Sequence, residues 1–157
     1  MIWLAQHGWD ATGIDISPTA IARATAAAET AGIERGRAWF QTADVTALPD
    51  GDYDLVSASF LHSPVALARE DILRRATTLI APGGHLLITS HAAFPAWADV
   101  PAGHQHHFLS PEEDLAQLEL DPQDWEVVHA ETRPRETTTP DGEAATLDDV
   151  VVLIRRR

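Results

Sequence analysis

The sequence contains no cysteine and no lysine, and its 157 residues include a single tyrosine. Without cysteine the chain cannot form a disulfide, a thiolate metal site or a cysteine nucleophile. All 11 basic residues are arginine, and 24 Asp and Glu outnumber them, so the formal net charge is −13. Because nucleic acid is held mainly by clustered Lys and Arg, this balance argues against a nucleic-acid partner.

Long apolar runs are also missing. The longest apolar stretches have about the length of a strand, well below the ~20 residues of a membrane span. No basic segment precedes Met1–Ala5, as one would in a signal peptide. We therefore expect a soluble, cytoplasmic protein with no membrane partner. The 45% hydrophobic content and the length are typical of one folded domain, expected to cover residues 1–157.

Strand patterns alternate with helix patterns along the chain. Ser17 and Pro18 predict the start of a helix that Gly32 ends, and a second helix is expected over Arg69–Ile80, closed by the turn at Pro82–Gly84. The expected strands cover Ala11–Ile16, Arg37–Thr42, Tyr53–Phe60, Leu86–Thr89, Trp125–Thr132 and Leu147–Arg155. This order indicates the α/β class with a mostly parallel sheet.

Two of these regions carry a more specific expectation. The apolar strand Tyr53–Phe60 is expected to be buried on both faces. The last two strands are separated by a polar connection containing Pro and Gly, so they are expected to form an antiparallel hairpin at the edge of the sheet.

A long loop is expected over His91–Leu109, before a short helix whose capping box begins at Ser110. The loop contains His104, His106 and His107, a spacing that can bind a metal ion. No carboxylate motif accompanies these histidines, so we expect no metal site.

The ends of three expected strands carry residues suited to ligand binding, because ligands of open parallel sheets bind beyond the carboxyl ends of the strands. Asp15 ends the first strand, where a carboxylate can accept hydrogen bonds from both hydroxyls of a ribose. Asp44 follows the second strand and can accept from an exocyclic amine such as that of adenine, while the Val45 N–H donates to a ring nitrogen. Ser59–His62 ends the third strand, where a substrate or the reactive end of a cofactor would bind.

The segments Trp9–Pro18, Ala43–Val45, Tyr53–Val56 and Leu79–Gly84 resemble successive motifs of class I S-adenosylmethionine-dependent methyltransferases. The resemblance covers nearly the whole chain. It implies a Rossmann-like sheet with helices on both faces and S-adenosylmethionine as the cofactor.

The resemblance also implies a role for individual residues. Asp15 would bind the ribose hydroxyls, Ile16 would pack on the adenine, and Asp44 with Val45 would recognise the adenine edge. Ser59 and Phe60 are expected to complete the set of cofactor-binding residues.

One part of the family pattern is missing from this sequence. The first strand and its acidic-x-Gly-x-Gly-x-Gly loop have no counterpart, and Met1–Gly8 resembles the end of the helix that follows that loop. In the family the missing strand lies between those that correspond to Ala11–Ile16 and Tyr53–Phe60. Because a buried unpaired backbone group costs about 1–3 kcal/mol, we expect a fragment or a misplaced start, with the missing strand and loop encoded in frame upstream.

Methyl transfer from a sulfonium is an in-line displacement, so positioning and desolvation can supply most of its acceleration. His62 is the candidate to accept a proton from the substrate. The lack of cysteine excludes the covalent mechanism of cytosine C5 methylation, and no Asn/Asp-Pro-Pro-aromatic motif of amine-methylating DNA enzymes follows the third strand. Together with the acidic charge, this favours a small-molecule acceptor.

Two other functions stay open. Nicotinamide-dependent reduction also uses an acidic residue at a strand end, but Ala43–Val45 and Pro82–Gly84 fit it less well, and the lack of lysine excludes a Tyr-x-x-x-Lys pair. The other is a non-catalytic methyltransferase-like remnant that serves as an interaction or regulatory module. The sequence indicates neither the acceptor atom nor the oligomeric state.

Overall fold

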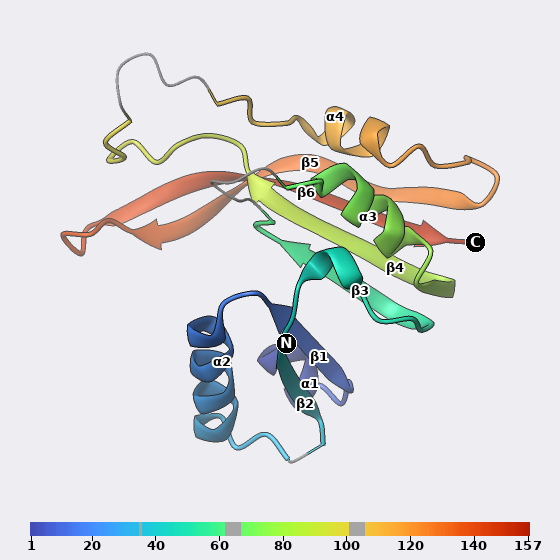
Figure 1. Ribbon diagram of the computed structural model, residues 1–157. Helices are drawn as coiled ribbons and strands as arrows, with labels where there is room; N and C mark the ends of the chain where they lie inside the picture. The colour runs from blue at the N-terminus through green and yellow to red at the C-terminus, as the bar shows by residue number, and fades with distance from the viewer. Residues whose placement is uncertain (35, 62–66, 101–105) are drawn as a thin grey trace. The chain divides into compact units, whose positions relative to one another are not determined.

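The structure, a computed structural model, describes residues 1–34, 36–61, 67–100 and 106–157 (Figure 1). The chain divides into two compact units, unit 1 (Met1–Pro49) and unit 2 (Asp50–Arg157), and each is described by itself. The single domain expected over residues 1–157 stays a prediction.

Unit 1 is a β-α-β unit that follows a short helix. Its elements are α1 (Ile2–Gln6), β1 (Ala11–Asp15), α2 (Pro18–Thr30), β2 (Ala38–Thr42) and the 3₁₀ helix η1 (Val45–Ala47). β1 and β2 pair in parallel, with Asp15 opposite Thr42. The predicted start of α2 is confirmed: Ser17 is the N-cap, its hydroxyl accepts the N–H of Ala20, and Pro18 occupies the first turn.

In its described residues, unit 2 is a four-stranded sheet with two helices. Its elements are β3 (Tyr53–Ser59), α3 (Arg69–Thr77), β4 (Ile80–His91), α4 (Pro111–Gln117), β5 (Trp125–Thr138) and β6 (Ala144–Arg156). The strand order is β3-β4-β6-β5, with β3 and β4 parallel and β6 antiparallel to both of its neighbours. The predicted α/β class and the antiparallel hairpin at one sheet edge are therefore confirmed.

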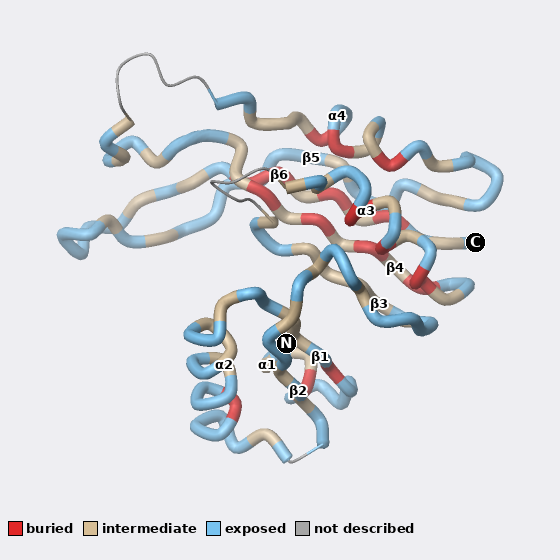
Figure 2. The backbone as a smooth tube through the Cα atoms, viewed as in Figure 1, coloured by how far each residue is buried: buried red, intermediate tan, exposed pale blue. Residues whose placement is uncertain are grey.

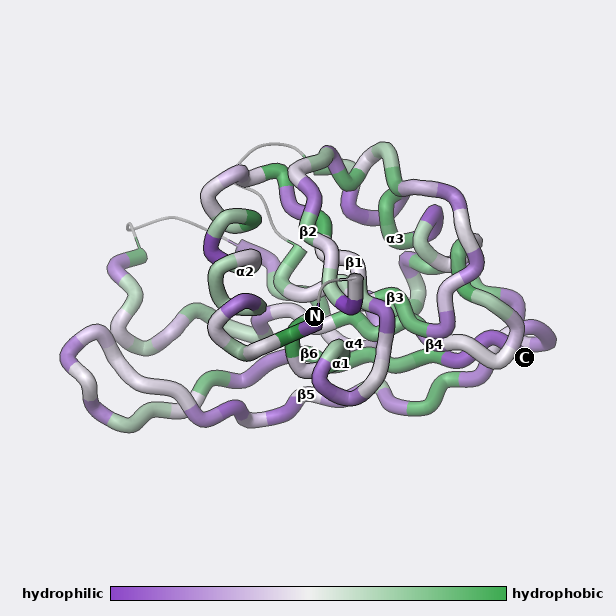
Figure 3. The backbone as a smooth tube through the Cα atoms, turned by 90° about the horizontal axis from the view of Figure 1, so that it is seen from below, coloured by the Kyte–Doolittle hydropathy of each residue, from purple (hydrophilic) through white to green (hydrophobic). Residues whose placement is uncertain are grey.

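The core of unit 2 lies on the sheet face that α3 and α4 cover (Figure 2). Side chains alternate between the faces of a strand, so every second residue is buried over residues 84–90 of β4 and 150–154 of β6. In Figure 3 hydrophobic residues follow β4 and β6, whereas the β5–β6 connection is mostly hydrophilic. The core is formed chiefly by Leu73, Ile80, Leu86, Ile88, Val150, Val152 and Ile154.

The expectation that Tyr53–Phe60 is buried on both faces is wrong. Every residue of β3 is half-buried or exposed, because β3 pairs only with β4 among the described strands and so forms an edge of the sheet of unit 2. In unit 1, β1 likewise pairs with β2 alone within the described ranges. These are the two strands between which the family pattern places its missing strand.

The predicted end of the second helix is also wrong. α3 stops at Thr77, and Ile80 already pairs with Tyr53 as the first residue of β4. The Pro82–Gly84 segment lies inside β4, where the β3–β4 ladder shifts its register. A Cβ on Gly84 would lie 2.8 Å from the Tyr53 carbonyl oxygen, so only glycine fits this irregularity.

The later elements agree more closely with the sequence. The capping box of α4 is present, since Ser110 and Glu113 each bond to the other's backbone N–H. β5 and β6 are both longer than predicted, because the polar residues on either side of the turn continue the ladder. None of the helices in the described ranges has the length and apolar character needed to cross a membrane.

Candidate functional site

The parallel pair in unit 1 brings two predicted carboxylates to one edge. Asp15 ends β1, Asp44 caps η1 just beyond β2, and the Ala43 N–H donates to the Asp15 carbonyl at 3.1 Å. The Oδ1 of Asp15 accepts the Ser17 N–H at 2.7 Å, and the Oδ1 of Asp44 accepts the Thr46 N–H at 2.9 Å. These bonds orient both side chains, and a carboxylate has two oxygens with about four acceptor positions. Each can therefore accept further hydrogen bonds from a ligand.

The surroundings of these carboxylates suit a nucleoside. Hydrogen bonds from the backbone N–H and then the hydroxyl of Thr46 lower the pKa of Asp44, so it is an anionic acceptor at neutral pH. Ile16, directly after Asp15, leaves 71% of its surface exposed. Val45 is half-buried at the start of η1. An exposed aliphatic side chain next to an oriented acceptor is a suitable surface for a flat, weakly polar ring that carries hydrogen-bond donors.

The end of β3 in unit 2 has a strained backbone. Ser59 is exposed, and its hydroxyl lies 3.3 Å from that of Ser57. Phe60 follows with a φ of 52°, and its N–H donates to the Thr89 carbonyl at 2.8 Å. A positive φ on an aromatic residue is unfavourable, and strained residues of this kind cluster at functional sites. His62, the predicted proton acceptor, lies outside the described residues.

A polar cluster that the sequence reading missed lies beside Phe60. The His91 ring at the end of β4 packs on the Phe60 ring with centroids 4.5 Å apart. The Nδ1 of His91 lies 3.3 Å from the Oδ1 of Asp149 on β6. Asp149 is nearly fully buried and also accepts from the Nε of Arg135 at 2.5 Å. This bond to Asp149 raises the pKa of Arg135, whose guanidinium lies 5.6 Å from the Phe60 centroid.

The cluster has a defined chemical consequence. Because an ionised carboxylate only accepts hydrogen bonds, the proton of neutral His91 belongs on Nδ1, which places the lone pair of the ring on Nε2. About 40% of the His91 side chain is exposed. A histidine oriented by a buried aspartate in this way is suited to accept a proton from a ligand.

Sequence reasoning missed this cluster because His91 and Asp149 are 58 residues apart and meet only through the β4–β6 pairing. One signal was present. Asp149 lies inside the expected strand Leu147–Arg155, immediately before the apolar run Val150–Ile154. An acid buried in such a strand needs a partner.

Of the two loop histidines that the structure describes, one pairs with a carboxylate and the other packs on an aromatic ring. The Nε2 of His107 lies 3.0 Å from Glu113, and His106 packs edge-on against Phe108 with centroids 4.4 Å apart. His104 lies outside the described residues. Within the described part of the chain, no three His, Asp or Glu side chains group as they would around a metal ion.

Comparison with known proteins identifies the family. The sequence model of the methyltransferase domain family matches residues 1–84 of the 157. A curated relative, ribosomal RNA small subunit methyltransferase C of Alcanivorax borkumensis, is 29% identical over an alignment of 109 residues that covers 66% of this chain and 33% of the relative. The chain therefore spans about one third of the length of this relative.

Two solved structures show the same fold. A SAM-dependent methyltransferase from Methanosarcina mazei superposes with a TM-score of 0.67 at 22% identity, over 98% of this chain and 85% of that one. The N-methyltransferase NodS from Bradyrhizobium japonicum, solved with S-adenosyl-L-homocysteine, gives 0.60 at 18% identity, over 92% and 65%. The chain thus belongs to the methyltransferase domain family and has the Rossmann-like fold of class I S-adenosylmethionine-dependent methyltransferases.

Proposed function

We propose that this chain catalyses methyl transfer from S-adenosylmethionine to a small-molecule acceptor. The observation that carries the proposal is the pair of oriented carboxylates in unit 1. Asp15 and Asp44 lie at one edge of a parallel pair, with exposed Ile16 beside them. Together with the family, this donor and acceptor pattern matches the adenosine part of the cofactor.

The residues of unit 1 offer hydrogen-bond acceptors, a donor and an apolar surface that suit a nucleoside. Asp15 accepts from the ribose hydroxyls, Ile16 covers the adenine, and Asp44 with the Val45 N–H recognises its edge. In unit 2, Ser59 and Phe60 are the further residues that we assign to the cofactor. When bound, S-adenosylmethionine supplies an electrophilic methyl group on a sulfonium, which departs as a neutral thioether.

In unit 2 we assign proton transfer to His91. Its Nδ1–H donates to Asp149, and its Nε2 takes the proton that an acceptor hydroxyl or amine loses. Arg135 also donates to Asp149, which holds this carboxylate in place beside His91, where it stabilises the imidazolium that forms. His62 remains a second proposed proton acceptor.

The acceptor could be a small molecule or an RNA, and the charge favours the former. The curated relative is named for ribosomal RNA. RNA binding depends on arrays of Lys and Arg, whereas this chain has a net charge of −13. Of its described arginines, Arg37, Arg69, Arg74 and Arg155 are each paired with a carboxylate. The cytoplasmic location expected from the sequence is likewise a proposal.

Calorimetric titration with S-adenosylhomocysteine tests the cofactor assignment. We expect saturable binding that Asp15→Asn weakens about tenfold or more, because Asn keeps an oxygen for the Ser17 N–H but loses the charge. Asp52→Asn, an exposed carboxylate outside the site, is the matched control and should leave the affinity unchanged. Absence of binding by the unaltered chain would contradict the proposal and support the non-catalytic remnant.

Transfer of a labelled methyl group distinguishes the acceptors. Incubation of the chain with labelled S-adenosylmethionine and either total RNA or a small-molecule extract should label the extract alone. Label that enters RNA, and that ribonuclease releases, would overturn the small-molecule assignment while leaving methyl transfer intact.

A further inference from the structure

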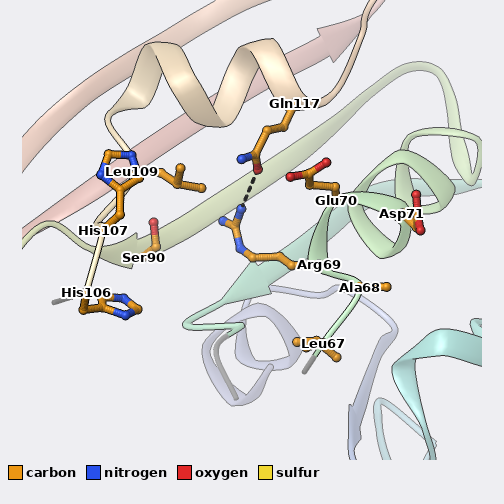
Figure 4. A pocket seen from close by; sticks show the side chains of 10 residues that line it. All are labelled: Leu67, Ala68, Arg69, Glu70, Asp71, Ser90, His106, His107, Leu109 and Gln117. Carbon is orange, nitrogen blue, oxygen red and sulfur yellow. Dashed lines mark hydrogen bonds between the residues drawn. The ribbon is translucent and has the colours of Figure 1, made fainter. Parts of the chain in front are cut away.

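A cavity of about 410 Å³ lies in unit 2, among the start of α3, the end of β4 and the approach to α4 (Figure 4). Apolar side chains of Leu67, Ala68 and Leu109 form part of its wall. The polar lining includes Arg69, Ser90, His106, His107 and Gln117. A cavity of this volume with an apolar wall and a few polar groups has the size and composition of a small-molecule site.

The most unusual group in the cavity wall is the guanidinium of Arg69. Its Nη1 donates to the Oδ1 of Asp114 at 2.6 Å and reaches Gln117 Oε1 at 3.5 Å. Asp114 is fully buried, and only 12% of the Arg69 side chain is exposed. The Ser90 hydroxyl supports the pair by donating to Asp114 at 3.4 Å. The arginine is therefore held in one orientation by groups from β4 and α4.

In that orientation, the Nε side of the guanidinium takes no part in these hydrogen bonds. Both hydrogen bonds that it makes to described residues start at Nη1, and its Nε is buried with no hydrogen-bond partner in the described part of the chain. A buried donor left unsatisfied is unfavourable, so such donors usually meet a ligand or a water. The N–H groups of Nε and Nη2 are parallel and match the two oxygens of a carboxylate.

We propose that this cavity binds a small carboxylic acid, whose carboxylate takes the Nε side of Arg69 and whose apolar part packs on Leu67, Ala68 and Leu109. Asp114 keeps Nη1, so one arginine holds two carboxylates on different nitrogens. That this acid is the methyl acceptor rests on the proposed function; that the cavity binds a carboxylate does not.

The charges around the cavity permit an anion. Glu70 and Asp71 also line it, but both pair with Arg74, at 3.1 and 2.9 Å. The carboxylate of Glu113 pairs with His107 at 3.0 Å. The negative groups at the rim are thus each next to a cation or a histidine. The Nε and Nη2 donors of Arg69 belong to the buried wall, where a charged hydrogen bond is strongest.

NMR titration of the ¹⁵N-labelled chain with sodium benzoate tests the site through the Nε–H signal of Arg69, which Arg69→Lys identifies by its loss. We expect this signal to shift saturably with benzoate. The neutral isostere benzamide should bind with at least fivefold lower affinity. Sodium chloride at equal ionic strength should not move it. A signal that ignores benzoate, or responds equally to benzamide or chloride, would overturn the proposal.

Variants separate binding from folding. Arg69→Lys keeps a cation for Asp114 but lacks the parallel N–H groups of Nε and Nη2. It should therefore weaken benzoate binding about tenfold or more. Arg75→Lys, the same change on the same helix outside the cavity, should leave the affinity within about twofold. If Arg69→Lys does not fold, Leu109→Ala serves instead and should weaken benzoate several-fold. Unchanged affinity in whichever variant folds would also overturn the site.

This result can be distinguished from failure of the proposed function. Benzoate binding without S-adenosylhomocysteine binding would keep the carboxylate site and contradict methyl transfer. The reverse outcome would contradict the carboxylate site alone.

Discussion

The two units of the chain differ most in what they bury. The buried hydrophobic residues of unit 1 are all alanines, namely Ala5, Ala11 and Ala28, whereas those of unit 2 are mainly Leu, Ile and Val. Full burial of a Leu, Ile or Val side chain stabilises a fold by about 1.5–3 kcal/mol, and alanine contributes much less. Unit 2 therefore holds most of the stability. Unit 1 presents its most distinctive side chains, Asp15, Ile16 and Asp44, at the surface.

Their ion pairs differ in the same direction. Arg69 and Asp114 form a buried pair in unit 2, whereas Arg37 and Asp10 in unit 1 leave 44% and 67% of their side chains exposed. A buried pair is costly to break because the remaining charge is left without a partner, and an exposed pair contributes little. The comparison indicates that unit 2 is the rigid scaffold and unit 1 the more easily opened part, as ligand-binding segments often are.

The largest expected effect comes from breaking the buried pair. Asp114→Ala should lower the free energy of unfolding of unit 2 by about 3–5 kcal/mol. Asp10→Ala, its exposed counterpart, should cost less than about 1 kcal/mol. Urea denaturation followed by circular dichroism measures both. Equal losses would show that burial does not separate the two pairs.

Truncation of one isoleucine in each unit tests the difference in core packing. Ile88 on β4 is 1% exposed, and Ile88→Ala should cost about 2–5 kcal/mol in denaturant unfolding. Ile14 on β1 is only half-buried, so Ile14→Ala removes fewer contacts and should cost clearly less. If Ile14→Ala proved the more damaging change, unit 1 would be the better packed of the two.

Loss of one helix cap in each unit should have a smaller and more local effect. Ser17→Ala and Ser110→Ala each remove a side-chain acceptor from a helix start, worth about 1 kcal/mol. Hydrogen exchange should show faster exchange in α2 alone for the first and in α4 alone for the second. Acceleration across both units by either change would contradict their separate stability.

The smallest expected effect is a dependence of stability on pH in the acid range. The backbone N–H of Thr46 lowers the pKa of Asp44, and that of Ser110, with His107, lowers the pKa of Glu113, from ordinary values of 3.8 and 4.5. The folded chain binds fewer protons at these groups than the unfolded one, so their stabilisation is complete above those values and is lost as the pH falls below them. Carbonyl ¹³C titration by NMR should give midpoints below 3.8 and 4.5. Midpoints at or above these values would contradict the hydrogen bonds.

The sequence predicted those parts of the fold that local chemistry determines. The Ser17 and Ser110 caps set the starts of α2 and α4, and the strand patterns placed Asp15 and Asp44 just at the ends of β1 and β2, as the structure has them. The end of α3 was mistaken because Ile80 fits the helical period equally well, and only its pairing with Tyr53 makes it a strand residue.

The side-chain clusters of unit 2 depend on tertiary pairing and could not be read from local patterns. Arg69 and Asp114 are 45 residues apart, and His91 and Asp149 are 58 apart. The first pair joins α3 to α4 and the second joins β4 to β6, so both depend on tertiary contacts. The burial of Tyr53–Phe60 was overestimated for a similar reason, because its composition suits a central strand but the described chain pairs it on one side only.

Hydrogen–deuterium exchange with and without S-adenosylhomocysteine tests the central claim most directly, because it shows where the nucleoside binds. We predict slower exchange at two segments of unit 1, residues 14–17 and 44–47, with the Val45 amide among the most protected. Asp15→Asn should remove this protection, and Asp52→Asn should leave it in place. Unchanged exchange in both segments at saturating ligand would contradict the assignment of unit 1 as the cofactor-binding part of a methyltransferase.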